Sequence, residues 1–409
     1  MTIYLKNFSK AVRNVSLCLK CTALMFLKKI REGKGVFQSW IRASLFHPRT
    51  KSSSPGTSCE YMKYDTDKNE CRSFIVKDCR KVILNISIIG YDKKGESVLV
   101  WITDESEKDS DKKVKYCMVI DCWQEDIKSD DNQQITLNKT LELLQSINIS
   151  HIDILCWTHP HDDHYMGLLE VVNSGRCNNK TRFLVPSKLE DNADLLQLSQ
   201  YEKDILKSMH GFRNKNNWPV SEVSIAKDKG TQNIEVLLFT DEMMNAFTVN
   251  IDCLAPYSNF LSDLIDRKKK GEVNNIEMND FSIALNMKFG PYDFNFCGDI
   301  EDKMARKIKT SCFRHNTFIK VPHHTGMSAQ LVETLIEPDK TALACTTVFQ
   351  SVGDPNPSLV KRYKTSCHNI YSTGEYQAGD AHYGIVHYVF DLFGRQEVII
   401  RKEGHAIKL

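Results

Sequence analysis

Short runs of apolar residues, separated by polar turns, follow one another along the chain from about residue 70 to its end. Runs rich in valine and isoleucine predict strands, and the longer mixed segments between them predict helices. Two helices are predicted, Gln134–Ile147 and Leu189–Met209. Strands interleaved with helices indicate a layered α/β body. The predicted strands are Ser73–Ile89, Ser97–Thr103, Val114–Asp121, Ile152–Trp157, Phe183–Pro186, Glu235–Pro256, Phe318–Val321, His387–Leu392 and Glu397–Arg401.

Some polar segments carry predictions of their own. Phe281–Phe289 and Tyr292–Cys297 flank a Gly-Pro pair, which predicts a hairpin. The charged stretch Glu105–Lys113 predicts an exposed hairpin loop. The basic stretch Asp263–Glu272 predicts a solvated surface loop. Its run Arg267–Lys270 is the obvious source of side chains that could bind phosphate.

Residues 1–60 differ in composition and in hydrophobic pattern from the rest of the chain. They are basic and helical in pattern, and Lys51–Ser58 has the composition of a linker, so we expect a boundary there. The apolar patch Val15–Leu27 is interrupted by Lys20 and is shorter than the roughly 20 apolar residues that a membrane span needs. We therefore predict no membrane span. We expect instead an amphipathic helix that packs on the body or on a protein partner.

Composition narrows the class of protein without naming a function. The 409 residues suit one large domain with an extra segment, and we place that domain at 70–409. The formal net charge of +2 gives no global field that favours nucleic acid or a membrane. The 14 cysteines are scattered and form no paired CxxC motifs, which is typical of a reduced, cytoplasmic protein.

The chemistry concentrates in one cluster of three histidines and two aspartates within six residues, directly after the predicted strand Ile152–Trp157. Imidazole and carboxylate groups are ligands of zinc and related divalent metals. His159 and His161 lie two residues apart, so on an extended loop they can point the same way. Asp163 and His164 begin the next predicted helix, where they can face a second metal. The cluster therefore predicts a metal centre.

Two later segments can complete this centre. Asp299 follows Gly298 after a predicted strand, where the backbone can come close to a metal and a bridging carboxylate would fit. Alone, this motif is better explained by a plain turn aspartate. His323 and His324 are adjacent after the strand Phe318–Val321, and that pair is also ambiguous alone. All three segments lie at strand ends, where active sites in α/β layers collect.

These motifs together resemble a known family. The pattern His-x-His-x-Asp-His at 159–164 resembles the signature of the metallo-β-lactamase superfamily, and Val119-Ile-Asp121 resembles its first motif. Gly298-Asp299 followed by Val-Pro-His-His-Thr-Gly resembles the ComEC-like branch, which includes hydrolase domains of DNA-uptake proteins and phosphorylcholine esterases. The resemblance covers about residues 70–395. It implies an αββα four-layer sandwich after an N-terminal helical segment, with an insertion at about 187–275 that covers the site.

The resemblance also implies two divalent metal ions, zinc or alternatively manganese, and a role for each motif. Asp299 would bridge both metals, and either His323 or His324 would be the last ligand while its neighbour contacts the leaving group or phosphate. Asp163 would orient the attacking hydroxide if it is not fully committed as a ligand, and Asp121 would hold a ligand from behind. The implied metal ligands are His159, His161, Asp163, His164, Asp299, His323 and His324.

Other polar residues are expected to be structural. Many family members carry a further histidine ligand, for which His210 is the candidate here, but it follows a helical stretch and the ComEC-like branch often lacks that ligand. His382 and His387 lie at a strand start, where core or edge positions are commoner than ligands. Lys320 could meet an anionic substrate, although a strand lysine that faces solvent is the simpler expectation.

The function that follows is a dinuclear metal-dependent hydrolase that cleaves a phosphodiester, in nucleic acid or a nucleotide-like substrate, with a metal-activated hydroxide. One alternative is hydrolysis of a carbonyl ester, lactone or thioester. Another is a metal-stabilised, non-catalytic module in a protein assembly, with residues 1–60 as its docking arm.

Overall fold

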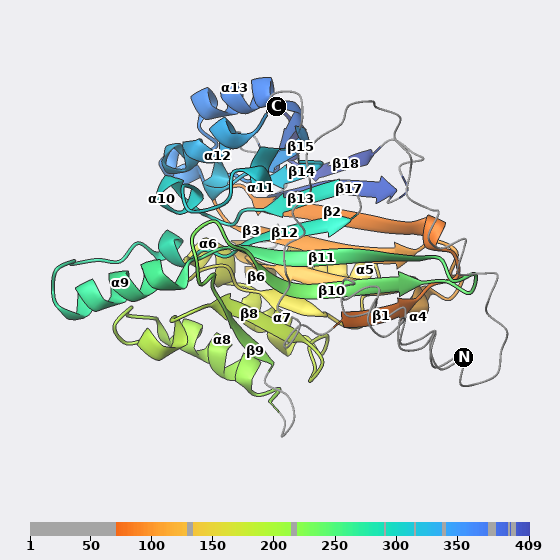
Figure 1. The fold of residues 1–409 in the computed structure, drawn as a ribbon, viewed down its shortest axis with the longest axis horizontal. Helices are drawn as coiled ribbons and strands as arrows, with labels where there is room; N and C mark the ends of the chain where they lie inside the picture. The colour runs from red at the N-terminus through yellow and green to blue at the C-terminus, as the bar shows by residue number, and fades with distance from the viewer. Residues whose placement is uncertain are drawn as a thin grey trace, which may run out of the picture.

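The computed structural model describes residues 71–128, 134–213, 219–289, 292–314, 316–337, 341–374, 382–391, 393 and 398–409. The basic helical segment and linker predicted at 1–60 lie outside the described residues. Two large β-sheets pack face to face, and helices cover their outer faces (Figure 1). Among the described residues, no helix is both long and apolar enough to span a membrane.

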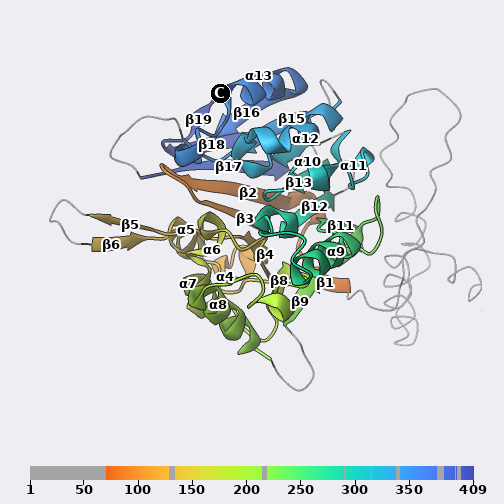
Figure 2. The ribbon, with the colours of Figure 1, turned by 90° about the vertical axis from the view of Figure 1, so that its left-hand side faces the viewer.

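Within the described residues, one sheet has nine strands and the other has eight. The nine-stranded sheet has the order β1 (Cys71–Ile75), β10 (Gln232–Thr240), β11 (Ala246–Ala255), β12 (Ala284–Phe289), β13 (Tyr292–Phe296), β14 (Phe318–Lys320), β15 (Thr341–Thr346), β16 (Cys367–Ser372) and β19 (Ile407–Lys408). The eight-stranded sheet has the order β18 (Ile399–Gly404), β17 (Tyr383–Asp391), β2 (Val82–Tyr91), β3 (Glu96–Asp104), β4 (Val114–Ile120), β7 (Ile154–Cys156), β8 (Arg182–Pro186) and β9 (Val220–Val223). A separate hairpin, β5 (Glu125–Lys128) and β6 (Gln134–Leu137), projects from the body (Figure 2).

The helices are short. The α-helices are α4 (Ser110–Lys113), α5 (Lys139–Ser146), α6 (Asp162–Tyr165), α7 (Leu168–Asn173), α8 (Gln200–His210), α9 (Ser258–Lys269), α10 (Asp302–Ala305), α11 (Ser311–Arg314), α12 (Gln330–Leu335) and α13 (Pro357–Ser366). The 3-10 turns are η1 (Cys79–Lys81), η2 (Glu190–Asn192), η3 (Met278–Phe281), η4 (His323–Thr325), η5 (Met327–Ala329) and η6 (Gln350–Val352).

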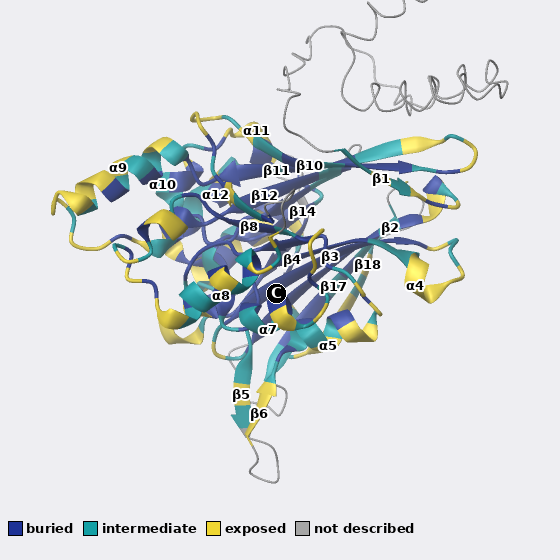
Figure 3. Ribbon diagram, turned by 90° about the horizontal axis from the view of Figure 1, so that it is seen from below, coloured by how far each residue is buried: buried dark blue, intermediate teal, exposed yellow. Residues whose placement is uncertain are grey.

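Strand β3 shows how the sequence builds the layers. Its nine residues are all buried. Val98, Val100 and Ile102 belong to the core between the two sheets, whereas Leu99 and Trp101 pack into a second core under helices α5, α7 and α8. Successive side chains of a strand point to opposite faces, so a strand with the uninterrupted apolar run Val98–Ile102 is a central strand covered on both sides. Figure 3 shows this burial across both sheets.

Helices α12 and α13 belong to the same core as the nine-stranded sheet, through Val332, Leu359 and Tyr363, and they lie on its side away from the other sheet (Figure 1). Both sheets mix parallel and antiparallel pairs. The predicted αββα four-layer sandwich is therefore confirmed. The predicted hairpin is also confirmed, since β12 and β13 pair antiparallel with Phe289 opposite Tyr292.

Two helix predictions and one loop prediction were wrong, each for a local reason. Gln134–Ile147 is not one helix, because its first residues form β6 and Asn138 then caps α5 by accepting the N–H of Leu141. The predicted helix Leu189–Met209 starts only at Gln200, where Ser199 and Glu202 form a capping box. The predicted surface loop Asp263–Glu272 is mostly helix α9, which buries Leu261 and Ile265.

The range 187–275 was expected to be an insertion that covers the site. In the fold its described residues contribute β9 to one sheet and β10 and β11 to the other, whereas η2, α8 and α9 lie outside the sheets. The division of the chain at 60–70, with one domain at 70–409, stays a prediction.

Candidate metal centre

The predicted motifs meet at one edge of the sandwich, where strands of both sheets end. In one sheet β4 runs parallel to β7, and in the other β13, β14 and β15 run parallel, so the loops that follow them leave from the same end. The Ile283 N–H donates to the Thr158 carbonyl (3.0 Å) and the His323 N–H donates to the Gly298 carbonyl (3.1 Å), which ties these loops together. Figure 2 looks onto this edge, with α6, α10 and α12 around it.

Asp121, directly after β4, organises the first motif. Its backbone is left-handed (φ 57°), and its carboxylate is fully buried. It accepts the Thr158 N–H (2.7 Å), the Thr158 hydroxyl (2.6 Å) and the His164 Nδ1–H (2.7 Å). Because the Thr158 hydroxyl gives its proton to Asp121, its oxygen accepts the His159 Nδ1–H at 3.0 Å. One carboxylate therefore fixes the tautomer of two imidazoles.

A second chain of hydrogen bonds orients His324. The Thr347 hydroxyl donates to Glu96 Oε2 (2.8 Å), so the Thr347 oxygen accepts the His324 Nδ1–H (2.7 Å). The Nε2 atom of His324 then faces Asp163 Oδ2 (3.0 Å) and Asp299 Oδ2 (3.6 Å).

All three buried imidazoles are thus held at Nδ1 and turn Nε2 toward the same place. The Nε2 atoms of His159 and His164 are buried and have no hydrogen-bond partner, and neither does Oδ1 of Asp299. Buried polar atoms without partners are costly, and they call for a group that the protein itself does not supply. Nitrogen and oxygen donors that converge in this way fit divalent cations, because such ligands keep one nitrogen for the metal and are oriented through the other.

Asp299 is positioned by its neighbours in the chain and across the sheet. Its N–H donates to the Ser282 hydroxyl (2.8 Å), and the preceding Gly298 has a left-handed backbone (φ 51°). A Cβ at Gly298 would lie 2.6 Å from Ser282 Oγ and 2.8 Å from the Ile283 carbonyl oxygen. Only glycine allows the backbone to pass so close while it turns Asp299 into the site.

Two donor groups share Asp299. The ligand atoms of His159, His161 and Asp299 lie within 4.8 Å of one another, and so do those of His164, His324, Asp299 and Glu96. His164 Nε2 lies 3.3 Å from Asp299 Oδ2, and His159 Nε2 lies 3.9 Å from the same oxygen. The arrangement can hold two cations with Asp299 between them.

Asp163, rather than Glu96, faces the Nε2 side of the second group. Its Oδ2 lies 3.0 Å from His324 Nε2 and 3.5 Å from His164 Nε2. Glu96 instead lies behind the rings, 4.0 Å from His164 Nδ1 and 3.7 Å from His324 Nδ1. It is already engaged by Lys320, whose Nζ lies 2.5 Å from Oε2. Glu96 therefore lies on the Nδ1 side of these imidazoles, and Asp163 lies on the Nε2 side, which they turn toward the centre.

Lys320 was expected to face solvent, and that prediction was wrong. Its side chain is buried, with Nζ 3.4 Å from the Gly298 carbonyl oxygen and 3.9 Å from Asp299 Oδ1. A buried ammonium is stable only when it is paired, and the carboxylate of Glu96 supplies that pair. The pair links β14 of one sheet to β3 of the other, directly beside the buried imidazoles.

The charges of the site divide between the two groups. Burial, and next the charge of His164, hold the pKa of His159 well below its ordinary value, and burial also lowers the pKa of His161. Burial would lower the pKa of His164 too, but the carboxylates of Asp299 and Asp163 raise it well above its ordinary value. These directions favour neutral imidazoles at His159 and His161 and a protonated His164 while no cation is bound, so a cation in the second group would compete with that proton.

His323 differs from His324 although the two are adjacent. Both, together with Thr325, have left-handed backbones (φ 48°, 49° and 66°), a sparsely populated region for residues other than glycine. This turn sends His324 into the buried centre and leaves His323 partly exposed at its mouth. There the Asn279 amide donates to His323 Nε2 (3.3 Å), and His323 Nδ1 lies 2.8 Å from the Ser328 hydroxyl.

The structure brings together the predicted residues at 121, 159, 161, 163, 164, 299, 323 and 324, as the distances above show. His210 lies elsewhere, paired with Glu190 (2.9 Å), and His387 contacts Ser87 and Glu403. Sequence reasoning missed Glu96 and Thr347. Glu96 starts a strand and Thr347 follows one, and neither belongs to a histidine-rich motif, so no local signal marked them.

No protein-family model and no curated protein matches the sequence. The comparison with solved structures does give matches. YhfI from Bacillus subtilis, a metallo-β-lactamase fold protein, is 9% identical with a TM-score of 0.34, over 72% of this chain and 98% of YhfI. Zn²⁺-bound PqqB from Methylobacterium extorquens is 8% identical with a TM-score of 0.34, over 69% of this chain and 96% of PqqB. A CmlA β-hydroxylase mutant is 13% identical with a TM-score of 0.26, over 64% of this chain, which spans only 35% of CmlA.

Proposed function

We propose that the chain is a dinuclear metal-dependent hydrolase of the metallo-β-lactamase superfamily, close to its ComEC-like branch. The observation that carries the proposal is the convergence of three Nδ1-anchored imidazoles around Asp299, with the Nε2 atoms of His159 and His164 left without a hydrogen-bond partner. A hydrophobic core gains nothing from such a set of buried polar atoms, whereas two cations would satisfy all of them. The order and spacing of the sequence motifs support the same family.

Each ligand has a role in this proposal. His159 and His161 would hold one cation, Asp163, His164 and His324 would hold the other, and Asp299 would bridge the two. When bound, the cations would supply Lewis acidity and lower the pKa of an attacking water. Asp121 and the Thr347–Glu96 pair would keep the imidazoles in the tautomer that leaves Nε2 free.

His323 is the residue that we assign to proton transfer. It lies at the mouth of the centre, is partly exposed, and is held through both ring nitrogens by Asn279 and Ser328. An imidazole placed there could donate a proton from Nε2 to the leaving oxygen of a substrate once it is protonated and the substrate has replaced the Asn279 amide at that nitrogen. In this proposal His324, whose Nε2 faces Asp163 and Asp299, is the last ligand.

We infer a phosphodiester as the substrate class. A bridged pair of cations suits in-line displacement at phosphorus, since it stabilises both the attacking and the leaving oxygen. Lys303, Arg306 and Lys307 line a groove beside Ser328, the residue that contacts His323, and thus place cationic side chains near the centre. Nothing comparable is needed for a neutral carbonyl ester.

The test combines metal content and activity on the same samples. Purified protein is compared with His161→Ala and Asp299→Ala for bound zinc and manganese and for cleavage of bis-p-nitrophenyl phosphate and single-stranded DNA. We expect close to two metal equivalents in the wild type, and loss of metal and cleavage in both variants. His210→Ala serves as the matched control and keeps both properties, because His210 lies outside the centre.

Other outcomes point elsewhere. Two bound metals without phosphodiester cleavage would redirect the search to lactones and thioesters. Bound metal without any hydrolysis, and full biological activity of His161→Ala, would favour a non-catalytic module. Absence of metal from the wild type would overturn the proposal.

A further inference from the structure

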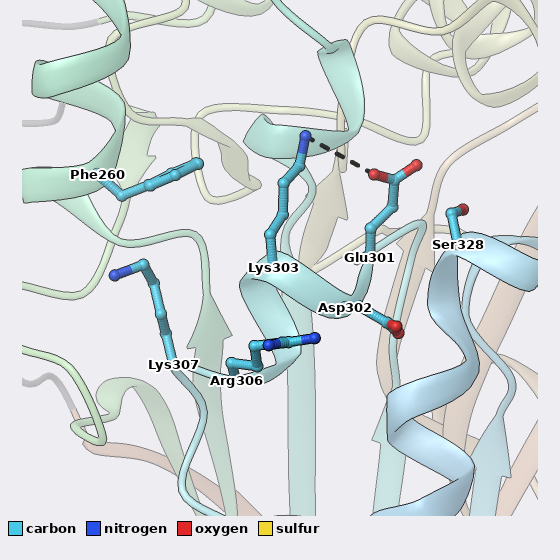
Figure 4. Close-up of a pocket in the computed structure, with 7 residues that line it drawn as sticks. All are labelled: Phe260, Glu301, Asp302, Lys303, Arg306, Lys307 and Ser328. Atoms are coloured by element: carbon cyan, nitrogen blue, oxygen red, sulfur yellow. Dashed lines mark ion pairs between the residues drawn. The ribbon is translucent and has the colours of Figure 1, made fainter.

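A groove of about 600 Å³ lies beside the metal centre, between α9 and α10. Figure 4 shows Phe260 of α9 at one side, Ser328 at the other, and the segment from Glu301 to Lys307 between them. Glu301 and Ser328 both contact His323: Glu301 Oε1 lies 3.6 Å and Ser328 Oγ 2.8 Å from His323 Nδ1. A substrate whose leaving group meets His323 would therefore extend its next chemical group into this groove.

The acidic residues of the groove are already engaged within the protein. Asp302 Oδ1 accepts the Leu331 N–H (2.7 Å) at the start of α12. Glu301 Oε1 accepts the Asn279 amide (3.2 Å), and its Oε2 lies 3.7 Å from Lys303. Both oxygens of Glu301 and one oxygen of Asp302 thus have partners within the protein.

The three cationic residues differ in how available they are. Lys303 lies 2.8 Å from the carboxylate of Asp280, which is buried. This lysine is therefore already held in an ion pair within the protein. Lys307 lies 3.1 Å from Asp228, an exposed carboxylate, and such surface pairs are weak and easily exchanged. The Arg306 guanidinium is exposed and forms no ion pair or hydrogen bond with any residue that the structure describes.

Lys307 and Phe260 add a second feature to the groove. The Nζ of Lys307 lies 5.6 Å from the centre of the Phe260 ring, so the groove presents an aromatic ring and a cation side by side. A guanidinium offers a planar fork of donors that matches phosphate oxygens, and an aromatic face suits stacking by a base. The combination fits a nucleotide better than a small neutral ester.

We propose that this groove is a subsite for a second phosphate of the substrate, bound by Arg306 and assisted by Lys307, with the attached nucleoside against Phe260. The inference rests on the proposed hydrolase function and narrows it to phosphodiesters that carry a neighbouring phosphate, as an oligonucleotide does. The metal centre would act on one phosphate while the groove holds the next and thereby sets the position of the scissile bond.

The test uses thymidine dinucleotides that carry or lack a terminal phosphate, with metal-loaded wild type, Arg306→Ala and Arg306→Lys. We expect Arg306→Ala to lower kcat/KM about tenfold for the phosphorylated dinucleotide, chiefly through KM, and less than about twofold for the other, because a charge-assisted bidentate contact is lost. Arg306→Lys should recover part of the loss. Lys309→Ala, which removes an equal charge from an exposed neighbour outside the groove, is the matched control and should change neither value.

A binding measurement separates this inference from the function on which it rests. Titration calorimetry with thymidine 3′,5′-bisphosphate should give weaker binding to Arg306→Ala than to wild type at equal metal content. If neither dinucleotide is cleaved but the binding difference appears, the phosphodiester substrate proposal fails, whereas the groove stands as a phosphate-binding site. If the dinucleotides are cleaved and Arg306→Ala matches wild type in both measurements, the subsite is overturned and the hydrolase proposal stands.

Discussion

Asp121 accepts a hydrogen bond from Nδ1 of His164, at 2.7 Å, although 43 positions of sequence separate the two residues. The same carboxylate holds Thr158, and through it His159. Loss of this carboxylate would free two imidazoles to rotate or change tautomer, although neither loses a metal-facing atom.

Asp121→Asn is therefore expected to weaken metal binding by about 10- to 100-fold, the usual effect of removing a residue that orients a metal ligand. Competition with a chromophoric zinc chelator measures the change. Asp126→Asn, on the projecting hairpin, is the control and should bind metal as wild type does. Wild-type affinity in Asp121→Asn would mean that the backbone alone orients the histidines.

The two adjacent histidines, His323 and His324, should have different functions. His324→Ala removes an inward-facing donor and should lose about one metal equivalent together with activity. His323→Ala should keep both metals but lower kcat by about 10²- to 10⁴-fold, as expected for loss of a general acid. Metal analysis and steady-state kinetics on the same preparations give the answer. Loss of metal from His323→Ala would reverse the assignment.

The buried pair of Lys320 and Glu96 should matter for stability. Lys320→Met leaves the Glu96 carboxylate buried and unpaired, which costs about 3–5 kcal/mol of unfolding free energy. Urea unfolding of the metal-free protein measures the loss. The double variant Lys320→Met, Glu96→Gln should recover a large part of it, since it removes the uncompensated charge. Equal stability of the single and double variants would show that the loss of unfolding free energy comes from packing and not from the unpaired charge.

Gly298→Ala should destabilise the centre. The new Cβ would lie 2.6 Å from Ser282 Oγ, and the left-handed backbone adds strain, so a loss of about 1–3 kcal/mol is expected. Thermal unfolding and metal content should both fall. Gly271→Ala also has a left-handed backbone (φ 73°) but open space around its Cβ, so it controls for backbone strain alone and should keep its metal.

The pH dependence follows from His164, whose pKa is raised well above its ordinary value. Burial opposes the shift, but Asp299, Asp163 and Asp121 outweigh it. In the metal-free protein this contributes stability below the ordinary pKa of histidine, and the contribution is lost as the pH rises through the folded-state pKa. A cation must displace the same proton, so metal binding should strengthen as the pH rises.

We accordingly expect the rise in Tm on zinc addition to be larger at about pH 8 than at about pH 6. Calorimetry in two buffers of different ionisation enthalpy should show proton release on binding at the lower pH. A zinc-induced rise in Tm that does not change with pH would mean that His164 is already neutral in the metal-free protein.

Much of this site was predictable, because its ligands come as short motifs at strand ends. His159 to His164 are close in sequence, and their spacing alone brings their side chains to one loop. The fold class followed from apolar runs such as those of β3 and β4, which the layered architecture buries on both sides.

Other features depended on local competition that a hydrophobic pattern does not record. Ser73–Ile89 reads as one strand, but Asp78 caps the turn η1 inside it, so β1 and β2 enter different sheets. In the same way, Asn138 and Ser199 decided where two helices begin.

The sequence by itself determined the donor types, their grouping at strand ends and the layered fold, since these depend on residue chemistry and short-range periodicity. Only the tertiary structure decided which atoms face inward. Glu96 and Lys320 meet across two sheets, Thr347 fixes His324, and the left-handed turn at 323–325 separates two adjacent histidines into a buried side chain and a partly exposed one. These outcomes depend on pairing between distant strands and on the cost of burying an unpaired charge, which no local segment of the chain contains.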